Sequence, residues 1–190
     1  VSKLPEKAKV EEDDRISISF MGRPNVGKSS LMNAMFEEEK VIVSDVSGTT
    51  RDSVELPFDY NDGEYKLIDT AGIPRRGKLR FSQLEKYSVL RSLQSLELAD
   101  IAVLVMDATE PISRQDLRVS QYILEAKKGL IVVVNKSDLV TPEDKNRIMH
   151  YLHKKMQYAH FAPVIFTSAM TGTNVKKILD IAKNIYVERS

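Results

Sequence analysis

The hydrophobic and polar positions of this chain form short apolar runs separated by longer amphipathic stretches. Residues 101–106 and 130–134 are almost continuously apolar, which is typical of strands buried on both faces of a sheet. Residues 84–99 instead carry an apolar side chain at every third position, which predicts a helix with one apolar stripe. The whole pattern predicts strands over residues 16–21, 53–60, 64–69, 101–106, 130–134 and 164–167, and helices over residues 30–36, 84–99, 114–126, 141–157 and 175–187.

Strands that alternate with helices predict a mostly parallel sheet covered by helices on both faces. Asn61, Asp62 and Gly63 join two of the strands, and this sequence favours a hairpin because glycine tolerates a positive φ. The hairpin makes one strand antiparallel. We therefore expect an α/β fold with a six-stranded, mostly parallel sheet and one antiparallel edge strand.

The first residues differ from the rest of the chain. Residues 1–14 are charged, contain Pro5 and have no apolar period, so we expect an acidic linker there and one domain over residues 15–190. The sequence does not begin with Met, and we expect it to be a domain excised from a longer protein with several domains.

Composition narrows the possible functions. With 28 basic and 27 acidic residues, the net charge of +1 gives no global case for nucleic-acid binding. The absence of Cys excludes disulfides and thiolate metal sites. No apolar run reaches the roughly 18–20 residues of a membrane span, and no signal-peptide pattern is present, so we expect no membrane partner.

A glycine-rich segment between the first strand and the first helix matches the pattern G-x-x-x-x-G-K-S. Such glycines let backbone N–H groups surround phosphates, and the helix start adds the positive end of its dipole. Lys28 is expected to reach the β- and γ-phosphates. The fold class is therefore that of a P-loop NTPase. The residues expected to hold the phosphates are Gly22, Asn25, Val26, Gly27, Lys28, Ser29 and Ser30.

A second segment distinguishes guanine from adenine. Asn135, Lys136, Ser137 and Asp138 follow the buried run 130–134, at the edge of the sheet where ligands bind. A carboxylate at Asp138 can accept hydrogen bonds from N1–H and the 2-amino group of guanine, and adenine offers neither donor. Asn135 is expected to connect neighbouring loops, and the stem of Lys136 to pack along the base or sugar. Taken alone, the segment also suits a solvated loop.

Small residues after the last strand complete the expected base site. Ser168, Ala169 and Met170 let a backbone N–H approach the carbonyl oxygen of guanine. The signal is weak alone, but three such loops in order after three strands predict a guanine-nucleotide site.

Two further loops are expected to respond to the γ-phosphate. Asp69 ends a strand and is expected to anchor Mg²⁺ together with Ser29, and the N–H of Gly72 is expected to meet the γ-phosphate. Thr50 is favoured over Thr49 as a third Mg²⁺ ligand. Loss of the γ-phosphate would release these loops, which gives an order–disorder switch.

These motifs together resemble the TRAFAC-class translation-related GTPases over residues 15–190. The resemblance implies catalysis by positioning a water and neutralising charge, with Lys28, Thr50, Asp69 and Gly72 taking part. Many such enzymes carry a glutamine where this chain has Ile73, which cannot hydrogen-bond a water. In similar GTPases an asparagine at the place of Asn25 holds K⁺ against the phosphates, so K⁺ is an expected cofactor beside Mg²⁺.

Several stretches resemble more closely the second G domain of the Der (EngA) family, bacterial tandem GTPases of large-subunit ribosome assembly. The stretches are residues 22–31, 41–52, 69–78, 85–93 and 107–116. The resemblance implies a cytoplasmic protein whose partners are the large ribosomal subunit or its rRNA, a preceding G domain and a following KH-like domain. Ser137 departs from the family, which usually has a large aromatic residue there. We expect the isolated domain to be monomeric.

Three functions remain open on the sequence. The first is a slow GTPase whose cycle times ribosome assembly. The second is a guanine-nucleotide-binding module that hydrolyses little on its own and regulates a neighbouring domain, and Ile73 keeps it open. The third is an ATP-using P-loop enzyme. Residues 75–78, which read Arg-Arg-Gly-Lys, suit either a contact with rRNA or a solvated loop. His150, His153 and His160 suit surface or packing roles rather than a metal site.

Overall fold

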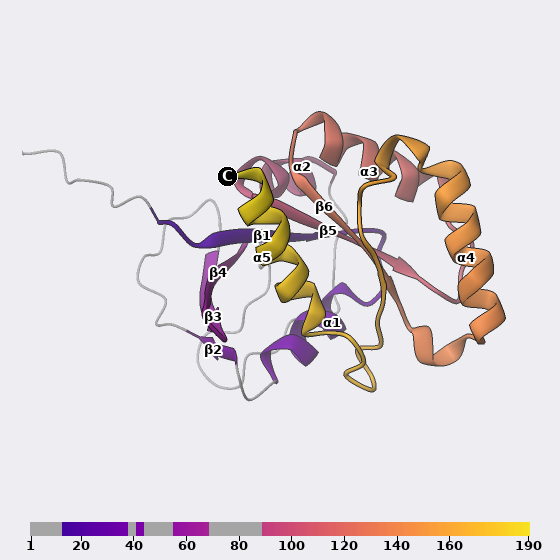
Figure 1. Ribbon diagram of the computed structural model, residues 1–190, viewed down its shortest axis with the longest axis horizontal. Helices are drawn as coiled ribbons and strands as arrows, with labels where there is room; N and C mark the ends of the chain where they lie inside the picture. The colour runs from indigo at the N-terminus through magenta and orange to yellow at the C-terminus, as the bar shows by residue number, and fades with distance from the viewer. Residues whose placement is uncertain (1–12, 38–40, 44–54, 69–88) are drawn as a thin grey trace, which may run out of the picture.

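The computed structural model describes residues 13–37, 41–43, 55–68 and 89–190. The strands are β1 Ile16–Met21, β2 Val41–Val43, β3 Glu55–Tyr60, β4 Gly63–Ile68, β5 Ile101–Asp107, β6 Gly129–Asn135 and β7 Val164–Phe166 (Figure 1). The helices are α1 Lys28–Phe36, α2 Val89–Leu98, α3 Arg114–Glu125, α4 Pro142–Lys155 and α5 Lys177–Arg189, with the short 3₁₀ turns η1 Ser137–Leu139 and η2 Gln157–Ala159.

The strands form one sheet in the order β2-β3-β4-β1-β5-β6-β7. The ladders from β4 to β7 are parallel, and β3 runs antiparallel to both of its neighbours. The predicted mostly parallel α/β sheet is confirmed, but it has seven strands rather than six. The additional strand is β2, which pairs Val41 with Tyr60 and has only three residues, too few to show an apolar period.

Each face of the sheet packs against its own set of helices. Residues alternate along β5, so that Ile101, Val103 and Val105 point to the core under α1 and α5. The intervening Leu104 and Met106 point to the core under α2, α3 and α4. All seven residues of β5 and all seven of β6 are buried, which confirms that their apolar runs are strands covered on both faces.

Capping boxes start two of the helices on the second face. The Thr141 hydroxyl accepts from the Asp144 N–H at 3.2 Å, and the Asp144 carboxylate accepts from the Thr141 N–H at 3.1 Å. With Pro142 in the first turn, this confirms the predicted helix start and contributes about 1 kcal/mol. Ser113 and Asp116 form the same arrangement at α3. Of the helix predicted over residues 84–99, residues 84–88 lie outside the described part of the chain.

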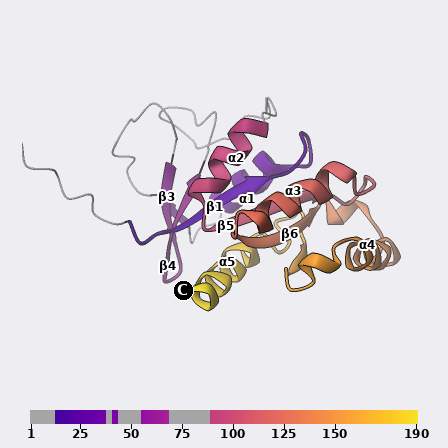
Figure 2. The ribbon, with the colours of Figure 1, turned by 90° about the horizontal axis from the view of Figure 1, so that it is seen from above.

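The hairpin between β3 and β4 forms as predicted, but its positive φ lies elsewhere than expected. Asn61 has a φ of 52°, whereas Gly63 does not have a positive φ. A Cβ on Gly63 would lie 2.6 Å from the ring of Tyr65, so glycine leaves room for that ring. Burial raises the pKa of Tyr65 to about 12, and its hydroxyl donates to the carbonyl oxygen of Leu179 in α5. Figure 2 shows α5 ending beside this hairpin.

Among the described residues, no helix is both long enough and apolar enough to cross a membrane.

Candidate functional site

The loop from β1 to α1 is shaped by two glycines at which a side chain would be strained. Gly22 has a φ of 141°, and a Cβ there would collide with the backbone carbonyl of Val105 in the next strand. Gly27 has a φ of 100°, and a Cβ there would collide with the side-chain amide of Asn135. Asn25 also has a positive φ, of 65°. The loop therefore lies directly against β5 and β6 in a conformation that favours glycine.

Lys28, the first residue of α1, folds back over this loop. Its ammonium donates to the carbonyl oxygens of Gly22 and Arg23, each at 2.8 Å. Ser29 is buried and Ser30 is half-buried in the first turn of the same helix. The lysine charge is thus placed at the mouth of the loop, beside the N-terminus of α1.

Asn135, at the end of β6, connects three loops. Its amide nitrogen donates to the carbonyl oxygen of Val26 at 3.1 Å. Its amide oxygen accepts from the Ala169 N–H and the Thr167 hydroxyl, both at 3.3 Å. The side chain is buried, so these bonds are shielded from water. The glycine-rich loop, the loop after β6 and the loop after β7 are therefore held at one edge of the sheet.

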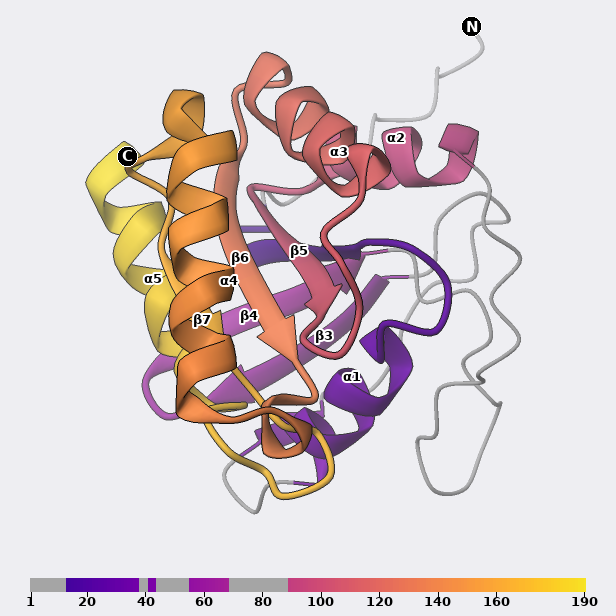
Figure 3. The same ribbon diagram turned by 90° about the vertical axis from the view of Figure 1, so that its right-hand side faces the viewer.

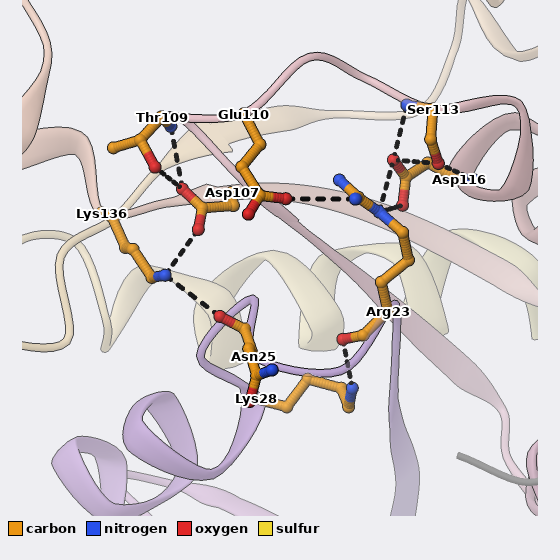
Figure 4. A network of polar contacts seen from close by, with 9 residues as sticks. All are labelled: Arg23, Asn25, Lys28, Asp107, Thr109, Glu110, Ser113, Asp116 and Lys136. Carbon is orange, nitrogen blue, oxygen red and sulfur yellow. Dashed lines mark hydrogen bonds and ion pairs between the residues drawn. The ribbon is translucent and has the colours of Figure 1, made fainter.

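Lys136 makes a second connection to the glycine-rich loop, with its backbone at a φ of 62°. Its ammonium donates to the carbonyl oxygen of Asn25 at 3.0 Å and to the carboxylate of Asp107 at 2.5 Å (Figure 4). Asp107 is buried and also accepts from the N–H and hydroxyl of Thr109. Burial opposes its ionisation, but the hydrogen bonds from Lys136 and Thr109 outweigh burial and hold the pKa of Asp107 below its ordinary value.

Arg23 attaches the glycine-rich loop to α3. Its Nε lies 3.1 Å from both carboxylate oxygens of Asp116, and its Nη1 lies 3.1 Å from Glu110 (Figure 4). The carboxylate of Asp116 is fully buried and is also part of the capping box with Ser113. Although partial burial opposes the charge, these two carboxylates raise the pKa of Arg23 above its ordinary value.

The residues expected around the base lie on the same edge but are more open. Asp138 is exposed in η1, while its neighbour Ser137 is buried and donates its N–H to Thr167 at 3.0 Å. Ser168 is buried, whereas the side chain of Met170 is 87% exposed. The loop after β7 is closed by its own bonds, from the Ser168 N–H to the Thr173 carbonyl and from the Thr171 N–H to the Ser168 hydroxyl.

The part of the chain that builds this arrangement matches a known protein family. The sequence profile of 50S ribosome-binding GTPases matches residues 17–136, from β1 through the loop after β6. The chain belongs to this family.

Curated relatives and solved structures agree with the family. The chain is 44% identical over 191 aligned residues to GTPase Der of Caldanaerobacter subterraneus, covering 99% of this chain and 43% of the relative. It is 46% identical to GTPase Der of Clostridium botulinum strain Okra, covering 93% of this chain and 40% of the relative. The chain thus spans less than half the length of these relatives. The structure of Aquifex aeolicus Era bound to GDP and AlF₄⁻ matches with a TM-score of 0.63 and 31% identity, over 88% of this chain and 56% of that chain.

Within this family's site, some expected residues lie outside the described part of the chain. They are Thr49, Thr50, Asp69, Gly72, Ile73 and residues 75–78. Among the described residues, Asn135 and Lys136 bond the glycine-rich loop and the loop after β7 to the end of β6.

Two charged pairs at this edge escaped the sequence analysis. Asp107 is the last residue of β5. A single acidic residue at the end of an apolar strand was the sequence feature that could have indicated its pairing with Lys136 after the next parallel strand. Arg23 pairs with Asp116 across 93 positions of sequence, and no periodic pattern links them.

The described residues fit a nucleotide with a magnesium ion. Gly22 and Gly27 let the loop pack directly against Val105 and Asn135 at the N-terminus of α1, where backbone N–H groups suit a phosphate. Lys28 supplies a positive charge, and the hydroxyl of Ser29 is a hard oxygen of the kind that Mg²⁺ prefers.

Proposed function

We propose that this chain is a G domain that binds guanine nucleotides and hydrolyses GTP to GDP and phosphate. The observation that carries the proposal is the pair of bonds by which Asn135 joins the carbonyl of Val26 to the N–H of Ala169. This single buried side chain connects the glycine-rich loop to the loops after β6 and β7 at one edge of the sheet, where open α/β sheets bind ligands. Membership of a GTPase family supports the same reaction.

At the phosphate end, the chain supplies fixed donors and one mobile charge. Backbone N–H groups of residues 25–30 surround the β-phosphate, and Lys28 exchanges its carbonyl partners for the β- and γ-phosphate oxygens. Ser29, Thr50 and Asp69 are proposed to hold Mg²⁺, which neutralises charge between the two phosphates when it is bound. Solved Era with MgGDPNP is 32% identical to this chain, with a TM-score of 0.62 over 88% of the chain, and supports the magnesium assignment.

At the base end, selectivity is assigned to Asp138. Its exposed carboxylate accepts from N1–H and the 2-amino group of guanine, whereas adenine would leave it without a donor. The small residues Ser168 and Ala169 let the backbone approach the guanine carbonyl. Lys136, whose ammonium is bound to Asn25 and Asp107, lays its stem along the base or sugar.

For hydrolysis, the chain needs another group that assists the reaction, because Ile73 cannot form a hydrogen bond to the attacking water. The N–H of Gly72 is proposed to meet the γ-phosphate, and Asn25 to hold K⁺ with its amide oxygen. Asn25 is exposed at a positive φ, and its backbone carbonyl accepts from Lys136 at 3.0 Å, so the backbone that carries this side chain is held in place. A monovalent cation there stabilises the charge that develops in the transition state.

The biological setting is proposed from the relatives. A cytoplasmic nucleotide switch in assembly of the large ribosomal subunit follows from relatives named GTPase Der and from the 50S ribosome-binding family. Since the chain spans less than half of those relatives, residues 1–14 are proposed to be a linker, with a further G domain before it and a KH-like domain after the chain. The ribosome or its rRNA is then the partner of the whole protein, and the isolated domain is a monomer.

Single-turnover hydrolysis of GTP in K⁺ or Na⁺ tests the proposal. We expect hydrolysis to be about tenfold faster in K⁺, and Asn25→Ala to remove that difference while GDP still binds. Asn146→Ala, an exposed asparagine on α4, is the matched control and retains the K⁺ effect. Binding without hydrolysis in either salt supports the alternative of a nucleotide-binding module, and competition by ADP as strong as by GDP rejects the guanine assignment.

A further inference from the structure

The positive charges of this chain are unevenly distributed, although their total is nearly balanced. Residues 145–179 contain no Asp or Glu, whereas the whole chain has 27 in 190 residues. The same stretch carries six Lys or Arg and all three histidines of the chain. It begins in α4 and continues through η2 and β7 to the first turn of α5.

The exposed side of α4 gathers several of these cations around an aromatic ring. His150, Tyr151, Lys154 and Lys155 are exposed, and their three- and four-residue spacings place them together on one side of the helix. Lys155 holds its ammonium 5.9 Å from the centre of the Tyr151 ring. The opposite side of the helix is anchored in the core by Leu152.

η2 and the two residues after it continue this side with three more exposed rings. Phe161 is 61% exposed, and the ring of His160 lies 5.8 Å from it at an interplanar angle of 79°. Tyr158 is 38% exposed, and its hydroxyl is held by the Leu117 carbonyl at 3.2 Å and the Ser120 hydroxyl at 2.7 Å. The rings are therefore presented on a turn that is fixed to α3.

We infer that the α4–η2 surface, formed by Tyr151, Lys154, Lys155, Tyr158, His160 and Phe161, binds single-stranded RNA. The lysines can contact phosphates, and the rings offer flat faces on which unpaired bases stack. None of the six residues that form this surface carries a carboxylate, which favours a polyanion over a protein partner that would bring both signs of charge. The solved Era complex with nucleotides of 16S rRNA shows that a structural neighbour binds RNA.

This surface lies away from the nucleotide site. The glycine-rich loop follows the carboxyl end of β1, whereas η2 immediately precedes β7, which runs parallel to β6. Figure 3 shows α4 running back along β6 from the end of that strand, so η2 reaches the opposite edge of the sheet. RNA and nucleotide can therefore bind at the same time. An RNA-binding surface here rests on the proposed ribosomal role for its biological setting, but RNA binding does not depend on hydrolysis of GTP.

Fluorescence anisotropy with a labelled single-stranded RNA of roughly 20 nucleotides tests the inference on the whole 190-residue chain. The double variant Lys154→Ala/Lys155→Ala should weaken binding about tenfold and reduce the slope of log K against log salt by about one. Phe161→Ala should weaken binding by a similar factor at unchanged salt slope, because it removes stacking rather than charge. A duplex RNA of the same sequence should bind more weakly than the single strand.

The matched control is Arg114→Ala/Arg118→Ala, which removes two exposed charges from α3. It should leave RNA binding near that of the unchanged chain. The inference is overturned if both double variants lose RNA binding equally, if neither loses it, or if the duplex binds more tightly than the single strand. No loss in either variant is the result expected if this surface docks another protein domain. GTP hydrolysis of the Lys154/Lys155 variant should be unchanged, and Asp138→Asn should still bind RNA, so a failure of the GTPase proposal is distinguishable.

Discussion

The two ends of the proposed nucleotide site are built in different ways. At the phosphate end, Lys28 bonds to the glycine-rich loop, and Arg23 and Lys136 connect that loop to α3 and to the end of β5. The carboxylates of Asp107 and Asp116 are buried. At the base end, Asp138 is exposed and Met170 is 87% exposed.

The difference shows that binding of the phosphate charge and recognition of the base are separated in this site. The loop that must meet the charge of a triphosphate is held in place in advance by the bonds of Arg23 and Lys136, because reorganising its backbone during the reaction would raise the barrier. A group that only distinguishes one base from another needs an open approach and one correctly placed acceptor. Damage at the phosphate end should therefore affect catalysis and stability, and damage at the base end should affect selectivity alone.

The largest effect is expected for Lys28→Met. Removing the charge beside the γ-phosphate should slow single-turnover hydrolysis about a thousandfold, as is typical when a principal transition-state donor is lost. Lys177→Met, which changes an exposed lysine in the first turn of α5, is the control and should retain the rate. A Lys28 variant that hydrolyses GTP at the original rate would show that this charge is not needed at the phosphate end of the site.

Next in size is Asp138→Asn at the base end. GDP affinity should fall about a hundredfold, because two hydrogen bonds to a charged acceptor are lost, and affinity for xanthine nucleotides should rise. Equilibrium titration with fluorescent nucleotides measures both changes. Asp180→Asn, an exposed acid on α5, should have neither effect. The free energy of unfolding of the Asp138 variant should stay within about 0.5 kcal/mol of the original, and a larger loss would contradict a purely selective role.

Arg23→Ala should destabilise the fold by about 2 kcal/mol, because it leaves the buried carboxylate of Asp116 without its partner. Urea denaturation measures the change. Arg147→Ala is the control, since its partners Glu143 and Asp144 are solvent-exposed or partly so and the expected loss is below about 0.5 kcal/mol. Equal losses in the two variants would show that the Arg23 pair is no more important than a surface pair.

The smallest effect is expected for Asp107→Asn and should depend on pH. The folded protein holds the pKa of Asp107 below its ordinary value, because bonds from Lys136 and Thr109 outweigh burial. The resulting stabilisation, about 1 kcal/mol, is complete above the unfolded-state pKa of about 4 and is lost as pH falls through the folded pKa. Urea denaturation should show a gap between variant and original chain at pH 7 that closes in acid. A gap of constant size at every pH would exclude ionisation of Asp107 as its source.

Elements that depend on near neighbours in the chain could be predicted from the sequence. The apolar runs at 101–106 and 130–134 became β5 and β6, and Thr141 with Pro142 marked the start of α4. The hairpin at Asn61 was found, although the positive φ was assigned to the wrong residue. β2 was missed because three residues carry no readable period.

The sequence by itself determined the α/β pattern, the glycine-rich loop and the family, because strand and helix periods and loop glycines are encoded within a few consecutive residues. Only the tertiary structure decided which loops meet. The strand order brings Asn135 to Val26, Lys136 to Asp107 and Arg23 to Asp116. The return of α4 along the sheet carries η2 away from the end of β6 where the glycine-rich loop lies. Such contacts join residues tens of positions apart, and their energies depend on burial and geometry that no local pattern carries.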